Sequence, residues 1–138
     1  MTAKELYEKQ KNFEFGYLWN KRVNFEELLG KTIVDICGAE PGSEVITIVC
    51  DDGSKYVMYH EQDCCENVEV NDICGDISCL LNTPLTKAEE VSNDSEETEW
   101  GSQTWTFYHL ATVKGYVTIR WLGESNGYYS ESVDFVKV

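Results

Sequence analysis

Basic side chains are scarce in this sequence of 138 residues. It has 11 Lys and Arg against 25 Asp and Glu, which gives a formal net charge of −14. Nucleic acids and anionic lipid both attract cationic surfaces, so this charge argues against direct nucleic-acid binding and against a membrane. No apolar run approaches the ~20 residues of a membrane span, and the first residues, MTAKELYEKQ, lack the apolar stretch of a signal peptide. These absences predict a cytoplasmic protein.

Sequence motifs that indicate a particular enzymatic reaction are also absent. The chain has neither the GxxxxGK[ST] nor the GxGxxG pattern of phosphate-binding loops, and its six cysteines include no CxxC pair. We therefore predict that the protein is not an enzyme and needs no cofactor. The sequence leaves its oligomeric state open.

The cysteines are expected to be reduced. An even count fits disulfides, but the chain exceeds 100 residues and its hydrophobic fraction of 42% suffices for a core. The adjacent Cys64 and Cys65 would point to opposite sides of a strand, and pairing them would need a strained ring. We expect Cys37 and Cys50 to be small core residues in apolar strands.

The densest cluster of ligand-type side chains is the run from His60 to Glu66, HEQDCCE. His60, Cys64 and Cys65 are weak metal candidates, because zinc prefers imidazole nitrogen and thiolate sulfur. The favoured alternative is structural, with Cys64 facing the core and the acids facing water or capping backbone amides. A Cys64 or Cys65 nucleophile beside a histidine is a third possibility, which the surrounding negative charge disfavours by raising a thiol pKa.

Negative charge is concentrated between residues 60 and 99, which hold twelve acids and one base, Lys87. Such density either keeps a solvated surface soluble or attracts a basic partner, with carboxylates spaced as phosphates would be. Buried unpaired ions are costly, so we expect these acids to form one largely contiguous exposed face and residues 92–99 to be an exposed loop. The predicted partner-binding residues are Glu89, Glu90, Asp94, Glu96, Glu97, Glu99 and Trp100.

The periodicity predicts an α+β fold that is mainly β: an antiparallel sheet of about six to eight strands with one or two short helices. An N-terminal arm, residues 1–24, is expected to be partly helical over 2–12 with Thr2 as the cap. Residues 25–138 are expected to form a single mainly-β domain. Asp51-Asp52-Gly53 between two β-rich runs predicts a hairpin.

The C-terminal region is predicted to be a three-strand meander over 103–113, 116–122 and 128–136. Its turns are expected at 114–115 and 123–127. Alternation places Trp105, Phe107 and His109 on the apolar face that the core covers, and Thr104 and Thr106 on the polar face. Mid-strand Arg120 is expected to pair with a neighbouring acid.

Several stretches carry a resemblance to a known family. They are YHEQDCCE at 59–66, DICGD at 72–76, Pro84, AEE at 88–90, GYVTIRW at 115–121 and SNGYYS at 125–130. The chain resembles, over roughly 30–138, a family of small uncharacterised proteins and domains of bacteriophages and prophages. The resemblance implies a phage or mobile-element origin and no assigned chemistry. Small accessory phage proteins often block host defence.

These observations favour an acidic interaction protein of a phage, acting in the host cell cytoplasm. It would inhibit a host defence or nucleic-acid-handling machine, as an anti-CRISPR or other anti-defence protein does, by occupying a basic groove. The expected partner is a basic host protein or nucleoprotein complex. The alternatives are a sponge that binds a small molecule or nucleotide, and a metal-binding or structural module.

Overall fold

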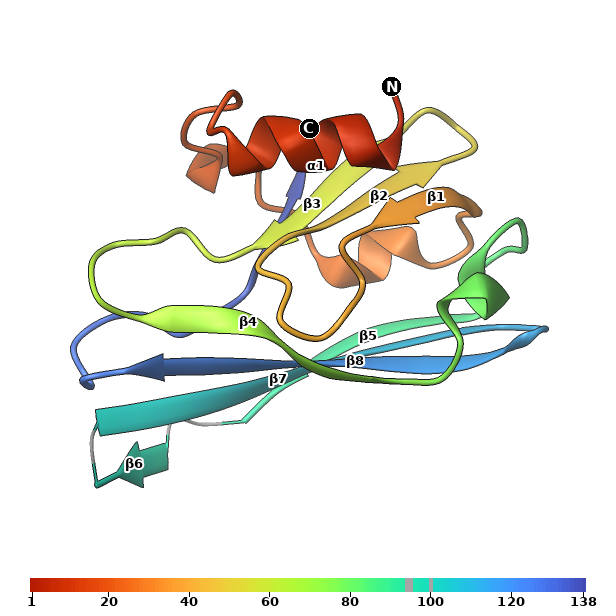
Figure 1. The fold of residues 1–138 in the computed structure, drawn as a ribbon. Coiled ribbons are helices and arrows are strands. Elements are labelled where there is room, and N and C mark those ends of the chain that lie inside the picture. Colours follow the sequence, from red (N-terminus) through yellow and green to blue (C-terminus); the bar gives the residue numbers. More distant parts are fainter. Residues whose placement is uncertain (94–95, 100) are drawn as a thin grey trace.

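Two antiparallel sheets face one another (Figure 1). The computed structural model describes residues 1–93, 96–99 and 101–138. The four-stranded sheet has the order β1-β2-β3-β9, with strands at Ile33–Cys37, Ile46–Cys50, Lys55–Tyr59 and Asp134–Lys137. The five-stranded sheet has the order β4-β8-β7-β5, with strands at Asn67–Cys74, Gly115–Ser125, Gly101–Thr112 and Lys87–Ser92, and β6 (Glu96–Thr98) also pairs with β7. The mainly-β prediction is confirmed, but the strands form two sheets rather than one of six to eight strands.

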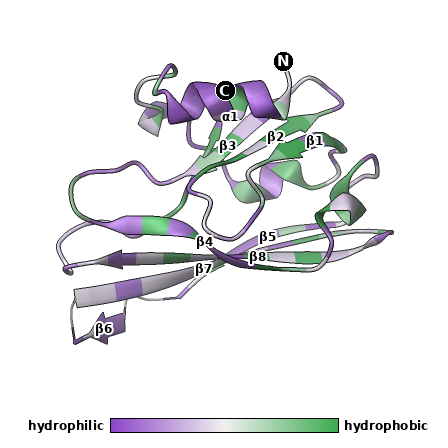
Figure 2. Ribbon diagram, in the orientation of Figure 1, coloured by the Kyte–Doolittle hydropathy of each residue, from purple (hydrophilic) through white to green (hydrophobic). Residues whose placement is uncertain are grey.

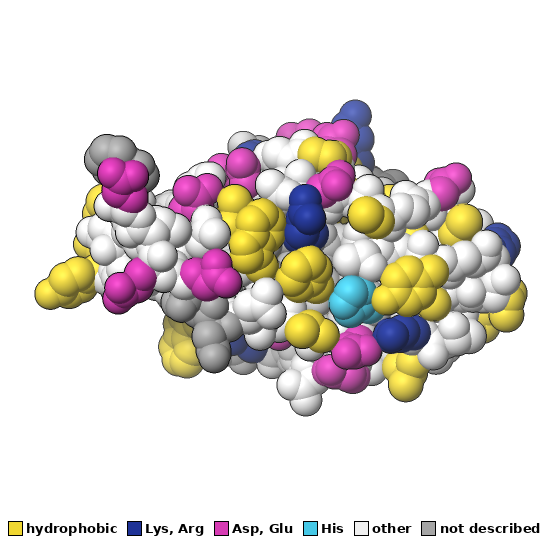
Figure 3. Space-filling view, turned by 90° about the horizontal axis from the view of Figure 1, so that it is seen from below, with side chains coloured by type: hydrophobic (Ala, Val, Ile, Leu, Met, Phe, Trp, Pro, Cys, Tyr) yellow, Lys and Arg dark blue, Asp and Glu magenta, His cyan; other side chains and the backbone are white. Residues whose placement is uncertain are grey.

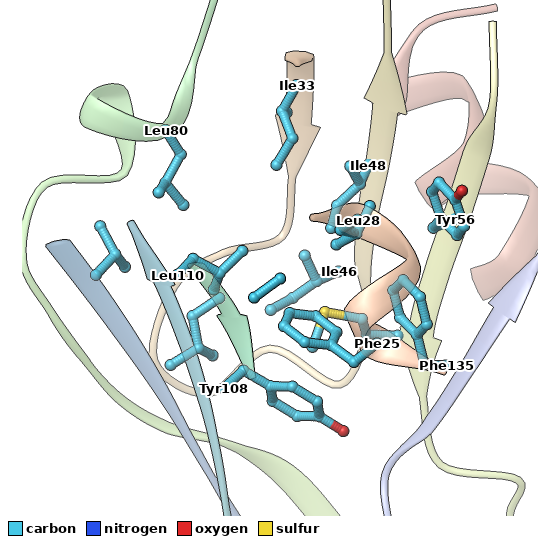
Figure 4. Packing of buried hydrophobic residues seen from close by; sticks show 14 of the residues in the cluster. Phe25, Leu28, Ile33, Ile46, Ile48, Tyr56, Leu80, Tyr108, Leu110 and Phe135 are labelled. Atoms are coloured by element: carbon cyan, nitrogen blue, oxygen red, sulfur yellow. The ribbon is translucent and has the colours of Figure 1, made fainter. Parts of the chain in front are cut away.

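The main core lies between the sheets. Figure 4 shows Tyr108 and Leu110 of β7 on one side and Ile46 and Ile48 of β2 on the other, all of them buried. Trp121 of β8 is fully buried in the same cluster. Removing a large apolar side chain from water contributes about 1.5–3 kcal/mol, so this layer of aromatic and aliphatic residues holds the two sheets together.

A helix covers the outer face of the four-stranded sheet. The helix α1 (Ala3–Lys11) begins after Thr2, whose hydroxyl accepts the Glu5 N–H at 3.1 Å, so the predicted cap is confirmed. Ala3 and Leu6 are buried against the sheet, and Thr47 of β2 donates to the Ala3 carbonyl at 2.5 Å. The exposed side of α1 is hydrophilic (Figure 2). The division into an arm and a domain at residue 24 stays a prediction.

Most local predictions match the structure. The β2–β3 hairpin turns at residues 51–53, where Gly53 has φ +86°, a conformation that glycine adopts without strain. The short 3-10 turns η1 (Trp19–Lys21) and η2 (Phe25–Leu28) lie between α1 and β1, and η3 (Ile77–Leu80) lies between β4 and β5. Within 92–99, residues 96–98 form the exposed strand β6 rather than a loop, while residues 94 and 95 lie outside the described residues.

The predicted meander is only partly right. Strands β7 and β8 pair as expected around the turn at 113–114. The third strand does not join them, because β4 occupies the free side of β8. Instead β9 crosses to the other sheet and pairs with β3, where Phe135 stacks on Tyr56 with ring centroids 5.1 Å apart.

The predicted faces of β7 are reversed. Thr104 and Thr106 are buried, whereas Trp105, Phe107 and His109 are partly exposed on the outer face of the five-stranded sheet. Register explains this result, because residues directly opposite in an antiparallel pair share a face. Thr106 lies opposite the buried Trp121, so the small threonine makes room for the large indole.

Candidate functional site

An aromatic stripe lies on the outer face of the five-stranded sheet, which none of the described elements covers (Figures 1 and 3). We define the stripe as Trp105, Phe107, His109 and Tyr116. Phe107 and His109 are nearly parallel, with ring centroids 6.2 Å apart, and His109 is 6.0 Å from Tyr116. Tyr116 is 49% exposed. Large rings in a row on an open sheet form a surface suited to contact with another molecule.

Two cations lie on the stripe, and both already have partners. The Arg120 guanidinium is 5.1 Å from the centre of the Trp105 ring and donates twice to the Asn71 side-chain oxygen, at 3.0 and 2.6 Å. Its predicted pairing with an acid is confirmed by Asp72, at 3.9 Å. These contacts hold the guanidinium against the Trp105 ring, so Arg120 forms part of the aromatic face.

The second cation, Lys87, is 5.5 Å from the centre of the Tyr116 ring and 3.5 Å from the Glu89 carboxylate. It is the one base that the sequence has between residues 60 and 99. Because its charge is shared with Glu89, it offsets little of the surrounding negative charge. Figure 3 shows carboxylates around the margins of this face.

The predicted partner-binding acids lie along one edge of the same sheet. We call Glu89, Glu90, Glu96, Glu97 and Glu99 the acidic edge. All five are exposed, on β5, on β6 and directly after β6, and both strands pair with the same side of β7. The other two predicted residues, Asp94 and Trp100, lie outside the described residues.

Register decides which acids face the stripe. Glu89 lies opposite His109 and Glu96 lies opposite Gln103, so both share the outer face with the stripe. Asp72 is on β4, at the far side of the sheet. Glu89 and Glu96 therefore flank the stripe on one side and Asp72 on the other. The acids of 60–99 do not form the one contiguous face that the sequence suggests, because Glu90 lies opposite the inward-facing Tyr108 and Glu66 is buried.

Glu66 is the clearest exception to the expected exposure. It is 5% exposed and accepts the backbone N–H groups of Asp63 at 2.6 Å and Cys64 at 3.1 Å. Its carboxylate also contacts Nε2 of His60 at 2.8 Å. Burial raises the pKa of Glu66, but these donors outweigh it and lower the pKa to about 2. The carboxylate thus organises the loop of residues 60–66.

The same loop corrects the cysteine prediction. Cys64 and Cys65 form a disulfide and both are exposed, so Cys64 does not face the core. The expectation rested on strand alternation, but residues 60–66 are a bent loop in which neighbouring side chains do not alternate. Cys37, Cys50, Cys74 and Cys79 are free. Cys50 is buried in the main core as predicted, whereas Cys37 is only partly buried.

The metal candidates are held by contacts of other kinds. The Nδ1 atom of His60 lies 2.7 Å from the Ser132 carbonyl, while Nε2 faces Glu66. Within the described residues there is no group of three or more His, Cys, Asp or Glu arranged to hold a metal ion. None of the described helices is long and apolar enough to cross a membrane.

Comparison with known proteins assigns most of the chain to one family. Residues 26–135 match the model of a family described as Domain of unknown function (DUF7448). The chain belongs to the DUF7448 family. This agrees with the expected membership of an uncharacterised family. No curated protein and no solved structure gives a significant match.

The DUF7448 match includes the acidic edge, the aromatic stripe and the 60–66 loop, and leaves α1 outside. Of these three features, sequence reasoning found the acids and the loop but missed the stripe as a surface. The available signal was the alternation of Trp105, Phe107 and His109 with two threonines, which fits either face of the sheet. Only the pairing of β7 with β8 selects the face.

Proposed function

We propose that this DUF7448 protein is an acidic interaction protein that acts by binding rather than by catalysis. It occupies a basic groove on a partner protein or nucleoprotein complex. The observation that carries the proposal is the uncovered sheet face, on which the aromatic stripe is flanked by carboxylates of β5, β6 and β4. Aromatic residues and arginine at the centre with charged residues around them are the usual composition of a protein interface.

The charge selects the class of partner. Carboxylates on a protein of net charge −14 attract cationic surfaces and repel nucleic acid. A basic groove that normally receives phosphates offers the matching field, so the partner we propose is a host defence or nucleic-acid-handling machine. The resemblance to phage proteins supports a phage origin and action in the host cell cytoplasm.

The two parts of the surface have separable roles. Exposed charges at the margin of an interface mainly change the rate of association and its dependence on salt. Desolvated rings at the centre mainly change the rate of dissociation. The acidic edge therefore steers the encounter, and the stripe holds the complex.

The test begins with capture of a partner from a bacterial host lysate at low salt, its identification by mass spectrometry, and kinetic measurements on the purified pair. Charge reversal of the acidic edge, Glu96→Lys, Glu97→Lys and Glu99→Lys, should slow association and flatten its salt dependence. The matched control reverses Glu8, Glu14 and Glu40, exposed carboxylates outside the five-stranded sheet. It changes the net charge equally and should have a smaller effect.

The stripe is tested with Trp105→Ala, which should speed dissociation and leave the salt dependence intact. A complex that forms independently of salt, or that responds equally to the edge and control reversals, contradicts the proposal. Binding of the purified protein to DNA or RNA alone contradicts it as well.

A further inference from the structure

Strand β4 carries a bulge beside the aromatic stripe. In the register of β4 against β8, Val70 lies opposite Trp121. The next pair is Asp72 with Arg120, so Asn71 is an extra residue with respect to β8. The first pair is buried in the core, whereas Asn71 and Asp72 are exposed. A bulge of this kind re-aims a side chain, and bulges are common next to functional sites.

The bulge brings two consecutive side chains to one guanidinium. Arg120 donates to the Asn71 side-chain oxygen from Nε at 3.0 Å and from Nη2 at 2.6 Å. The Asp72 carboxylate lies 3.9 Å from the same Nη2. In a regular strand, neighbouring side chains point to opposite faces of the sheet, so only one of these two would reach Arg120. The extra residue therefore accounts for the presence of both acceptors.

Arg120 requires these acceptors because of where its charge lies. The guanidinium is 5.1 Å from the centre of the Trp105 ring, on the face that the proposed function directs toward a cationic groove. Figure 3 shows basic side chains among the hydrophobic ones of this face. An uncompensated positive charge here would oppose such a partner. The Asn71 oxygen and the Asp72 carboxylate offset the charge at the edge of the guanidinium and leave the planar group beside the ring.

We propose that Asn71 is a positioning residue of the binding face. It holds the Arg120 guanidinium over the Trp105 ring, so that the guanidinium and the ring meet the partner as one preformed contact. Groups that are held in their bound geometry before association lose less conformational freedom when the complex forms. The use of this contact by the partner rests on the proposed function, whereas the holding of Arg120 is a property of the free protein.

The first arm of the test uses the full chain without a partner and follows the Nε–H resonance of Arg120 by NMR. Asn71→Ala should move this resonance toward its position in the urea-unfolded protein. It should also speed exchange with water about fivefold, because the hydrogen bond at Nε is lost. Asn71→Asp keeps an acceptor oxygen and should preserve the shift. The matched control is Asn67→Ala, which removes an exposed asparagine of the same strand and should leave the resonance unchanged.

The second arm measures dissociation from the captured partner. Asn71→Ala should speed dissociation about two- to fivefold, the factor that corresponds to an exposed cation–π contact, and Asn71→Asp should retain the slow rate. In a Trp105→Ala background, Asn71→Ala should have no further effect, because a positioning residue acts through the ring. A residue with a purely structural role would instead add its effect to that of Trp105→Ala.

An Arg120 resonance that is unchanged in Asn71→Ala overturns the inference, whatever the partner does. An unchanged dissociation rate, or additive effects of Asn71→Ala and Trp105→Ala, overturns the positioning role as well. These failures are distinct from failure of the proposed function, which the charge reversals of the acidic edge test separately. A complex with the expected salt dependence can form without this role for Asn71.

Discussion

Removal of the Glu66 carboxylate should destabilise the protein far more than removal of any exposed acid. Glu66→Ala leaves two backbone N–H groups and Nε2 of His60 without their acceptor. A buried donor that loses its partner costs about 1–3 kcal/mol. Water reaches part of this loop, whose residues 62–65 are exposed. We therefore expect the free energy of unfolding to fall by about 2–4 kcal/mol rather than by the full sum.

Glu66→Gln keeps one acceptor oxygen but loses the charge, so we expect it to lower the free energy of unfolding by about half as much as Glu66→Ala. The pKa of Glu66 is lowered from 4.5 to about 2 in the folded protein, so its ionised form is stabilising. That contribution is complete above about pH 4.5 and is lost as the pH falls towards 2. The shift corresponds to about 3 kcal/mol, which is the upper bound for the contribution of the ionised carboxylate.

Urea denaturation followed by circular dichroism at pH 7 measures the loss of unfolding free energy in Glu66→Ala and in Glu66→Gln. A series from pH 5 to pH 2 measures how the contribution of the ionised Glu66 carboxylate changes with pH. Asp63→Asn is the matched control, because Asp63 is an exposed carboxylate in the same loop. The difference in stability between the unmodified protein and Glu66→Gln should shrink as the pH falls. A Glu66→Ala variant as stable as the control, or a difference that does not change with pH, refutes this account of the loop.

Three further predictions concern the disulfide, the aromatic residues and one glycine. Alkylation of the unfolded, unreduced protein should label four cysteines, and prior reduction should expose Cys64 and Cys65, making six by mass spectrometry. Trp121→Ala should lower the free energy of unfolding by about 3–5 kcal/mol, while Trp105→Ala, on the open face, should cost about 1 kcal/mol, both by urea denaturation. Gly38→Ala should destabilise by more than about 1 kcal/mol in the same assay, because Gly38 has φ +85° and a Cβ there would lie 2.0 Å from the Val45 carbonyl oxygen.

Features set by neighbouring residues were predictable from the sequence. The Thr2 cap requires only a hydroxyl three residues before Glu5, and the β2–β3 hairpin requires only a glycine at a position of positive φ. Both depend on interactions within a few residues. The exposure of Glu96, Glu97 and Glu99 was predictable for a related reason, since a run without apolar residues has nothing to bury.

Features set by distant pairing were not predictable. Whether β9 joins β8 or β3 depends on which sheet edge is free, and β4, some fifty residues away in the chain, fills the one beside β8. The disulfide depends on the bent path of residues 60–66, which the buried Glu66 organises through three contacts. Neither edge occupancy nor loop path leaves a periodic signal in the sequence.

The reversed faces of β7 show how this limit bears on function. A rule that buries the more apolar face of a strand would place Trp105 and Phe107 in the core and Thr106 in water. The core already holds Trp121 directly opposite Thr106, and a second large ring there would overfill it. Trp105 and Phe107 therefore face outward, where the core does not require them, while Tyr108 is the ring of β7 that packs in the core. Large aromatic side chains that face solvent without a need of the core are typical of a protein interface. The outward orientation of Trp105 and Phe107, which the sequence did not predict, is therefore the observation that most directly supports the proposed binding face.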